Sequence, residues 1–407
     1  MTDDEAIRPF RIHISPADVD DLTERLRRTR WPAASPEPGW TRGVPLDYLQ
    51  DLARYWADDF DWRRREAELN RFPQFRTTIG GQDIHFLHVR SAEPNAIPMI
   101  ATHGWPSSAF EFEKIIGPLT DPRSHGGDPA DAFHLVIPSL PGYGFSTPVT
   151  APGSGNLFQV AQHWSELMNR LGYDRFAVQG TDVGSGVAGM LGMIAADRVI
   201  GIHLTGGQAA MPFGPPLDVD ALPVADRGRA ERFNEFRANG LGYLQLQASR
   251  PQTLSYALTD SPVGQLAWIV EKFQEWTDPA AKLPDDAVGR DQLLTNVSIF
   301  WFTGAGASAA HATYEGMQVW RAMTAAADEH TDADDDGSGG GGHQFGAAGG
   351  PTIGHAVFAA DTTIKSLVDP TNRVRHWSEF DVGGHFPAME APELLTGDIR
   401  AFFVGMR

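Results

Sequence analysis

One aspartate lies where a strand-to-helix turn would expose a nucleophile. The segment Gly180-Thr181-Asp182-Val183-Gly184 follows an apolar run and precedes a helix start that is rich in small residues. This is the pattern of a nucleophile elbow, with Asp where Ser is more usual. Small neighbours are required there because the sharp turn brings backbones close together. A carboxylate in that place can attack a carbon atom and form an ester, whereas an Asp that only caps the helix is the alternative.

A second motif, His103-Gly104-Trp105-Pro106, follows an earlier apolar run. We expect the backbone N–H groups of Trp105 and Val183 to form an oxyanion hole, which would hold the charge that develops when water attacks the ester. The alternative is a tight turn that contains a packed tryptophan.

Two further residues would complete a hydrolytic triad. His385 follows two glycines, after the last predicted strand and before the C-terminal helix. In the chain order nucleophile, acid, histidine, this is the position of the base that deprotonates water. Asp361 follows the preceding strand and is the candidate that orients the imidazole. It could instead cap a helix, and its weaker rivals are Asp369, Glu379 and Asp381.

The chemistry at Asp182 depends on hydroxyl donors in the segment that covers it. A carboxylate nucleophile suits an alkyl halide as well as an epoxide. An epoxide oxygen leaves as an alkoxide and needs a proton or hydrogen-bond donor. Tyr243, Tyr256 and Tyr314 lie in the predicted covering segment, although packing is the commoner role of a tyrosine there.

The elements that must position these residues alternate between strand and helix. Apolar runs at 97–102, 133–137, 176–179 and 199–204 are separated by helical patterns such as 157–171. This alternation predicts an α/β fold with a mostly parallel sheet that is covered by helices on both faces. The candidate residues follow strand ends, which is where open α/β sheets build their sites.

Five segments are expected along the chain. Residues 1–90 form an N-terminal arm with a helix that starts at the N-cap Ser15, a second helix over 46–60 and a strand pair. Residues 91–210 form the first part of the core, and 211–324 form a helical lid rich in aromatic residues. Residues 325–350 are acidic and then glycine-rich, which predicts a flexible insertion. Residues 351–407 return to the core.

Composition excludes several classes of function. The chain has 407 residues, a formal net charge of -19 and no cysteine. Disulfides and thiolate zinc sites are therefore excluded, and a nucleic-acid partner is not expected because phosphate binding needs basic patches. The start of the chain is acidic, and no apolar run is long enough to span a membrane. We expect a cytoplasmic protein with no membrane partner.

Taken together, these motifs resemble the microsomal-type epoxide hydrolases over nearly the whole chain. The matching segments are residues 25–32, 60–63, 103–106, 138–146, 261–273 and 383–393. The resemblance implies an α/β-hydrolase fold with that family's N-terminal extension. It also implies hydrolysis of a small-molecule epoxide to a vicinal diol with water and without a metal or organic cofactor.

The resemblance assigns roles to five side chains. Asp182 would be the nucleophile, His385 the water-activating base and Asp361 the charge-relay acid, while Tyr243 and Tyr314 would activate the epoxide. The sequence departs from relatives at three positions: Val183 stands where Trp is frequent, Ala359 where Pro is usual and Ser107 where Gly is common. The membrane anchor of mammalian members is not carried over, so we expect no membrane attachment.

Three other functions are compatible with an α/β-hydrolase scaffold. A haloalkane dehalogenase would use the same scaffold, but Val183 and the lid tyrosines argue against it. A non-catalytic small-molecule receptor would usually lack a triad member, and none is missing here. A serine esterase that uses Ser185 fails because Ser185 lies past the elbow. The aromatic lid suggests an apolar or aromatic epoxide, while the exact substrate, its stereochemistry, a detoxifying or biosynthetic role and a homodimeric state stay open.

Overall fold

The computed structural model describes residues 6–210, 213–331 and 350–406. Its centre is a nine-stranded sheet with the order β1-β2-β3-β5-β4-β6-β7-β8-β9. Neighbouring strands from β5 to β9 are parallel, and the three pairs at the β1 edge are antiparallel. The mostly parallel sheet is thus confirmed. The strands are β1 (Arg8–Phe10), β2 (Gln74–Ile79), β3 (Gln82–Val89), β4 (Ile97–Thr102), β5 (Phe133–Pro138), β6 (Phe176–Thr181), β7 (Val199–Thr205), β8 (Thr352–Val357) and β9 (His376–Glu379).

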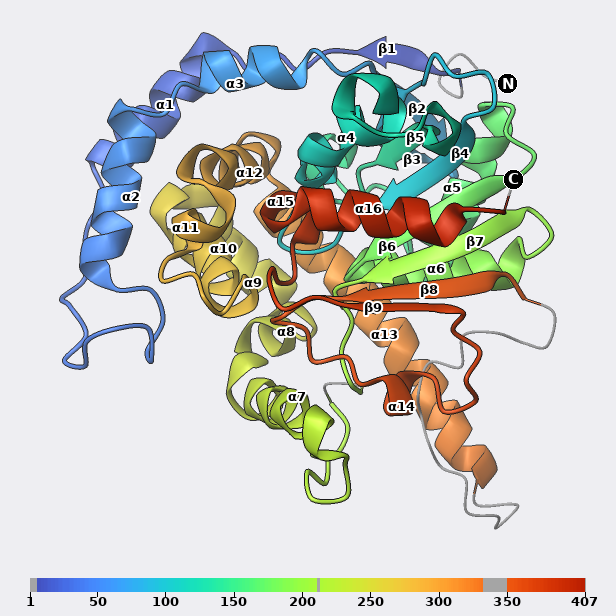
Figure 1. The fold of residues 1–407 in the computed structure, drawn as a ribbon. Coiled ribbons are helices and arrows are strands. Elements are labelled where there is room, and N and C mark those ends of the chain that lie inside the picture. Colours follow the sequence, from blue (N-terminus) through green and yellow to red (C-terminus); the bar gives the residue numbers. More distant parts are fainter. Residues whose placement is uncertain (1–5, 211–212, 332–349, 407) are drawn as a thin grey trace.

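Helices cover both faces of this sheet, as predicted. One face carries α4 (Glu113–Thr120) and α16 (Pro392–Phe403), and Figure 1 shows α16 crossing the near side of the strands. The other face carries α5 (Leu157–Arg170) and α6 (Val183–Ile194). Because side chains alternate along a strand, Ala177 packs with the α4 and α16 side and Val178 with the α5 and α6 side.

The N-terminal arm adds both sheet strands and a helical arc. Its helices are α1 (Pro16–Arg27), α2 (Leu46–Asp58) and α3 (Trp62–Leu69), and they curve around the lid helices (Figure 1). The predicted cap is present, since Ser15 Oγ accepts the N–H of Asp18. Helix α3 was not anticipated, because its Arg-rich sequence hides the apolar face. Its signal was the cap at Asp61, which accepts the N–H of Arg64.

A helical segment lies between β7 and β8 and covers the sheet's carboxyl edge. Its helices are α7 (Val224–Glu235), α8 (Gly242–Gln247), α9 (Pro251–Asp260), α10 (Pro262–Trp276), α11 (Pro284–Val288), α12 (Arg290–Thr303) and α13 (Ala305–Thr331), and a π turn (Phe236–Gly240) precedes α8. The arm packs on it, for example through the indole N–H of Trp56, which donates to Ser298 Oγ over 2.9 Å.

One expectation about the insertion is corrected. The backbone is helical through Thr331, so residues 325–331 belong to α13. The alanines there are strong helix formers and extend the helix. Residues 332–349 of the predicted insertion lie outside the described residues.

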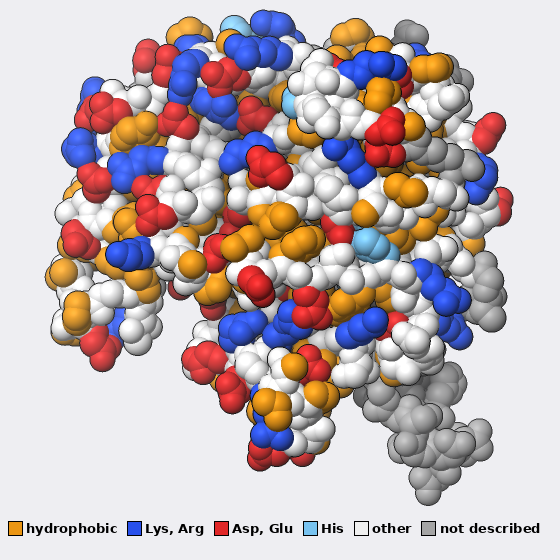
Figure 2. Space-filling view, in the orientation of Figure 1, with side chains coloured by type: hydrophobic (Ala, Val, Ile, Leu, Met, Phe, Trp, Pro, Cys, Tyr) orange, Lys and Arg blue, Asp and Glu red, His pale blue; other side chains and the backbone are white. Residues whose placement is uncertain are grey.

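The surface is mixed in charge. On the face in Figure 2, acidic and basic side chains are interspersed over the arm and the helical lid. Of the helices within the described ranges, none is both long and apolar enough to cross a membrane.

Candidate functional site

The predicted elbow is present at the end of β6. Asp182 stands between β6 and α6 with φ 53° and ψ -120°, a backbone conformation that a non-glycine residue rarely adopts. The surrounding backbones leave no room for larger residues. A Cβ added to Gly184 would overlap the carbonyl oxygen of Thr102, and one added to Gly180 would overlap that of Gly184. The small residues of the motif therefore make the turn sterically feasible.

The carboxylate of Asp182 is held by the amides that sequence analysis proposed as the oxyanion hole. Trp105 donates its backbone N–H to Oδ1 over 2.9 Å. Burial alone would raise the pKa of Asp182, but the proximity and charge of His385, with the backbone N–H groups of Trp105 and Val183, outweigh it and lower that pKa. The side chain is therefore ionised at neutral pH, as a nucleophile must be.

His385 faces the second oxygen of the same carboxylate. Its Nε2 lies 3.4 Å from Asp182 Oδ2, without a hydrogen bond of ordinary geometry. The backbone N–H of His385 donates to Trp276 O over 2.8 Å, and the two rings lie 5.0 Å apart. Burial would lower the pKa of His385, but Asp182, then Asp361 and Glu111, raise it above its ordinary value.

Asp361 is buried near His385, after β8. Its Oδ2 accepts the backbone N–H of Phe358 over 3.0 Å, and burial raises the pKa of this carboxyl to about 6. Among the hydrogen bonds of residues 350–406, none joins Asp361 to His385. The acid therefore acts on the imidazole through its charge in this structure, because the negative charge helps to raise the pKa of His385.

Tyr243 on α8 lies over the oxyanion loop. Its ring stacks on Trp105 with a centroid distance of 4.6 Å and an interplanar angle of 9°. Burial, followed by the charge of Asp182, raises the pKa of its hydroxyl. The structure therefore brings Tyr243 together with Asp182, His385, Trp105 and Val183.

Tyr314 lies outside this group in the structure, in contrast to the role that the resemblance implies. It lies on α13, and its side chain is 37% exposed. Residues of α13 that face the cavity above Asp182 include Thr313 and Met317 but not Tyr314. Successive helical residues are about 100° apart around the axis, so a shift of one position turns a side chain away. Tyr256 is also outside the group, with 69% exposure.

A cavity of about 380 Å³ opens above Asp182. Its walls combine the elbow, the loop after β5 and α13, and most of the side chains are apolar. Among the lining residues are Asp182, Val183, Tyr143, Leu157, Thr313 and Trp320. A volume of this size suits a small organic molecule.

A polar network behind the oxyanion loop was not predicted from the sequence. The carbonyl oxygen of Gly104 accepts two hydrogen bonds from Ser107, one from its backbone N–H over 3.2 Å and one from its side-chain hydroxyl over 3.1 Å. The same oxygen lies 2.9 Å from His103 Nδ1. His103 Nε2 accepts the N–H of Leu140, so Nδ1 must carry the proton that is donated to Gly104. The peptide that presents the Trp105 N–H is therefore anchored from its other end.

Glu111 extends this network into the core. Its Oε2 is hydrogen-bonded to Ser107, whereas Oε1 is buried without a partner. Burial raises the pKa of Glu111 to about 8, so the group is largely protonated at neutral pH. It can then donate to Ser107 Oγ, which frees the Ser107 hydroxyl to donate to Gly104. Polar residues directly after His103-Gly104-Trp105-Pro106 were the available signal.

Metal binding has no evident site within the described part of the chain, where no three His, Asp or Glu side chains are grouped as ligands would be.

Comparisons with known proteins give consistent matches. The family model "Epoxide hydrolase N terminus" matches residues 7–112, and "alpha/beta hydrolase fold" matches residues 97–262. A Stigmatella aurantiaca protein named "Putative epoxide hydrolase" is 40% identical, with 98% of this chain and 86% of that protein covered. Epoxide hydrolase 1 of Sus scrofa is 32% identical, with 98% of this chain and 89% of that protein covered.

Solved structures agree with these relatives. The juvenile hormone epoxide hydrolase of the silkworm Bombyx mori superposes with a TM-score of 0.83 and 28% identity, over 99% of this chain and 95% of that one. The Aspergillus niger epoxide hydrolase superposes with a TM-score of 0.81 and 29% identity, over 99% of this chain and 97% of that one.

Proposed function

The chain belongs to the epoxide hydrolase family with the α/β-hydrolase fold, and we propose that it opens an epoxide to a vicinal diol through an ester on Asp182. One observation supports this most directly. A half-buried carboxylate that lines a cavity accepts the Trp105 N–H at Oδ1 and faces His385 Nε2 at Oδ2.

The first step is alkylation of Asp182. A carboxylate oxygen attacks a ring carbon and forms a C–O ester bond, and the bond between that carbon and the ring oxygen breaks. The electron pair stays on the ring oxygen, which accepts a proton or hydrogen bond from the buried hydroxyl of Tyr243. The raised pKa of Tyr243 supports this role because the phenol remains protonated until the alkoxide forms.

The second step is hydrolysis of the ester. His385 removes a proton from water, and the oxygen adds to the ester carbonyl of Asp182. The N–H groups of Trp105 and Val183 hold the resulting oxyanion. Collapse expels the alkoxide, which takes the proton from His385 and leaves as the diol. The carboxyl group of Asp182 then ionises, and its proton returns to the phenolate. The charge of Asp361 supports the imidazolium in between.

A dehalogenase would need donors for a departing halide. The side chain beside the nucleophile, Val183, lines the cavity and has no N–H to offer. The Trp105 ring is stacked on Tyr243, which places a phenol near the position of the leaving group. These contacts favour an oxygen leaving group over a halide.

The substrate we propose is an apolar or aromatic epoxide. Leu140, Leu157, Val160, Met317 and Trp320 line the cavity, so an apolar substituent would bury its surface there at about 25 cal/mol per Å². A panel of styrene-type, aliphatic and polycyclic epoxides would rank these classes by kcat/KM.

The experiment that tests the mechanism is intact-mass analysis with an epoxide such as styrene oxide. We expect His385→Gln to accumulate one adduct with the mass of the epoxide, and Asp182→Asn to form no adduct and to lose turnover. The absence of an adduct in His385→Gln, together with full activity of Asp182→Asn, would refute the proposal. Chloride release from a chloroalkane without diol formation would favour the dehalogenase.

A further inference from the structure

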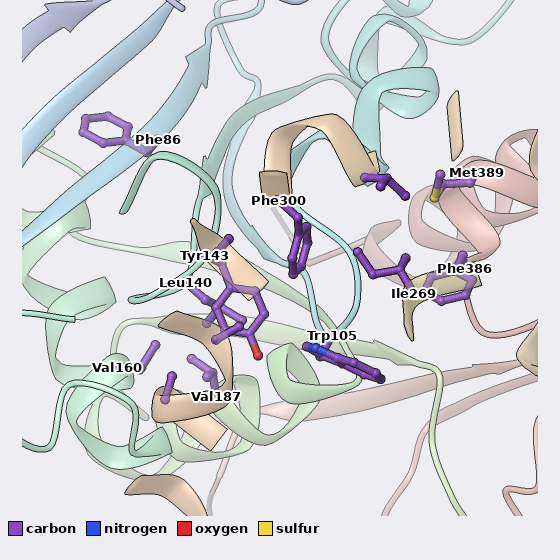
Figure 3. Close-up of a cluster of buried hydrophobic side chains, with 14 of the residues drawn as sticks. Phe86, Trp105, Leu140, Tyr143, Val160, Val187, Ile269, Phe300, Phe386 and Met389 are labelled. Carbon is purple, nitrogen blue, oxygen red and sulfur yellow. The ribbon is translucent and has the colours of Figure 1, made fainter. Parts of the chain in front are cut away.

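Tyr143 is a second buried phenol beside the nucleophile. It lies in the loop after β5, and its side chain is only 3% exposed. It lines the cavity together with Asp182. In Figure 3 its hydroxyl oxygen is directed toward the side of the cluster where Trp105 and Val187 lie. No role was assigned to this residue from the sequence.

We propose that Tyr143, carried by the core, is the second hydroxyl that hydrogen-bonds the epoxide oxygen beside Tyr243, in the place expected for Tyr314. The proposal rests on the function proposed above. It predicts that one donor comes from the lid and the other from the sheet scaffold.

The charge of Asp182 acts on both phenols. Burial raises the pKa of Tyr143, and the charge of Asp182 raises it further. Burial, followed by the charge of Asp182, also raises the pKa of Tyr243, and Tyr143 is among the groups that raise it further. Both hydroxyls therefore remain protonated donors, and each is close enough to Asp182 to sense its charge.

The ring of Tyr143 is held rigidly in place. Its edge packs on His103 with a centroid distance of 5.4 Å and on Phe300 at 6.3 Å. Its backbone N–H donates to Leu140 O, and its carbonyl accepts the N–H of Ser146, each over 2.9 Å. A donor fixed in this way needs little reorganisation when charge develops on the ring oxygen.

Thr313 explains why the helix can dispense with a phenol on its cavity face. Its hydroxyl donates to Ala309 O over 3.0 Å and is near enough to Tyr143 to offset part of the rise of that pKa. A short side chain at 313 leaves space for the Tyr143 ring, whereas Tyr314 lies on the exposed flank. The α13 residue at this point therefore lies beside a core phenol and supplies none itself.

During the proposed attack, negative charge moves from Asp182 to the ring oxygen, where the two phenols can stabilise it. When Asp182 attacks, the carboxylate loses its negative charge to the ester and the ring oxygen gains it. The charge that raised both phenol pKa values is then gone, so proton donation becomes easier as the alkoxide forms. One phenol transfers its proton to the ring oxygen and the other donates a hydrogen bond. The proton is restored from Asp182 after ester hydrolysis.

The test measures ester formation alone. In a His385→Gln background, single-turnover adduct formation from styrene oxide is followed by intact mass for Tyr143→Phe, Tyr243→Phe and Tyr314→Phe. Tyr256→Phe, an exposed lid residue, is the matched control. We expect Tyr143→Phe and Tyr243→Phe each to slow the adduct roughly 10²-fold, within the range of a lost acid catalyst, and the other two to stay within about twofold.

The outcomes separate the two proposals. Adduct formation at the parent rate in Tyr143→Phe, with a loss in Tyr314→Phe, would overturn the inference about Tyr143 while the ester mechanism stands. No adduct in the parent His385→Gln protein would instead reject the proposed function. Phe retains the ring packing, and an unchanged melting temperature excludes unfolding as the cause. If Tyr143→Phe does not fold, Thr313→Val provides a second test, since it removes the hydroxyl beside the phenol that influences its pKa and should also slow the adduct.

Discussion

The backbone N–H of Trp105 is bonded to Oδ1 of Asp182 over 2.9 Å, although 77 positions separate the two residues. Together with the larger influence of His385, this amide lowers the pKa of Asp182. In the proposed mechanism, attack by Oδ2 would leave Oδ1 as the ester carbonyl oxygen, so the donor would already be aimed at the atom that carries the oxyanion. Oxyanion stabilisation of this kind needs no rearrangement between the two steps.

The network behind that amide should affect hydrolysis of the ester. Removing the Ser107 hydroxyl takes one donor from the Gly104 carbonyl and weakens the polarisation of the peptide that presents Trp105 N–H. We expect Ser107→Ala to slow ester hydrolysis by about tenfold, which corresponds to ~1.4 kcal/mol, and to change adduct formation less. Single-turnover decay of the adduct in each variant measures both rates. Glu111→Gln retains a donor to Ser107 and is the control, so an equal loss in Glu111→Gln would argue against the hydroxyl relay.

His385 should titrate above its ordinary range in the free enzyme. Burial lowers its pKa, but Asp182 is the strongest influence that raises it. We therefore expect Asp182→Asn to lower the pKa of His385, and NMR titration of the imidazole protons would measure the shift. An unchanged or higher value in Asp182→Asn would contradict the arrangement.

The same coupling sets the pH dependence of turnover. The base must be neutral to accept a proton, so ester hydrolysis is lost as pH falls through the pKa of His385. In the ester Asp182 carries no charge, and the pKa of His385 should be lower than in the free enzyme. We expect the acidic limb of adduct decay to lie at lower pH than the NMR titration of free His385. A limb at higher pH would be inconsistent with this coupling.

The elbow should tolerate no added methyl group. A Cβ at Gly184 would overlap the Thr102 carbonyl, and such overpacking costs typically ~1–3 kcal/mol. We expect Gly184→Ala to lower the melting temperature and to abolish adduct formation. Gly397→Ala is the matched control, because a Cβ there meets open space within α16 and should stabilise the helix by ~0.5–1 kcal/mol. Equal melting temperatures for the two variants would refute the steric argument.

A carboxylate far from the site should contribute to stability at neutral pH. The carboxylate of Asp398 is hydrogen-bonded to His203 Nε2 and His376 Nε2, each over 2.8 Å. These bonds connect α16 to β7 and β9. Burial would raise the pKa of Asp398, but the hydrogen bond and charge of His203 outweigh it and lower the pKa to about 2. Because the folded pKa lies below the unfolded value, the stabilisation is present above pH 4 and is lost as pH falls toward 2.

Replacement of that carboxylate should remove this dependence. We expect Asp398→Asn to cost on the order of 2 kcal/mol at pH 7, as measured by urea unfolding. Its melting temperature should also vary less than that of the parent between pH 4 and pH 2.5. A parent and a variant with the same acid sensitivity would show that other groups control it.

Local patterns were sufficient for the scaffold and for most of the site. Apolar runs followed by turn residues predicted both ends of β4 correctly. They predicted the ends of β5, β6 and β7 to within two residues. Because parallel strands align their carboxyl ends at one edge, the order of those runs also implied that Asp182 and Trp105 would meet there. Small residues around Asp182 predicted the elbow, since only a close backbone approach demands them.

Tertiary structure decided what no local pattern contains. One residue along α13 rotates a side chain by about 100°, so only the packed helix shows that Thr313 faces the cavity and that Tyr314 does not. Tyr143 and Glu111 gain their character from burial and from the field of Asp182, both of which depend on residues distant in the sequence. Chemical identity and strand order are properties of the chain, whereas orientation, burial and charge environment arise only when its distant segments pack together.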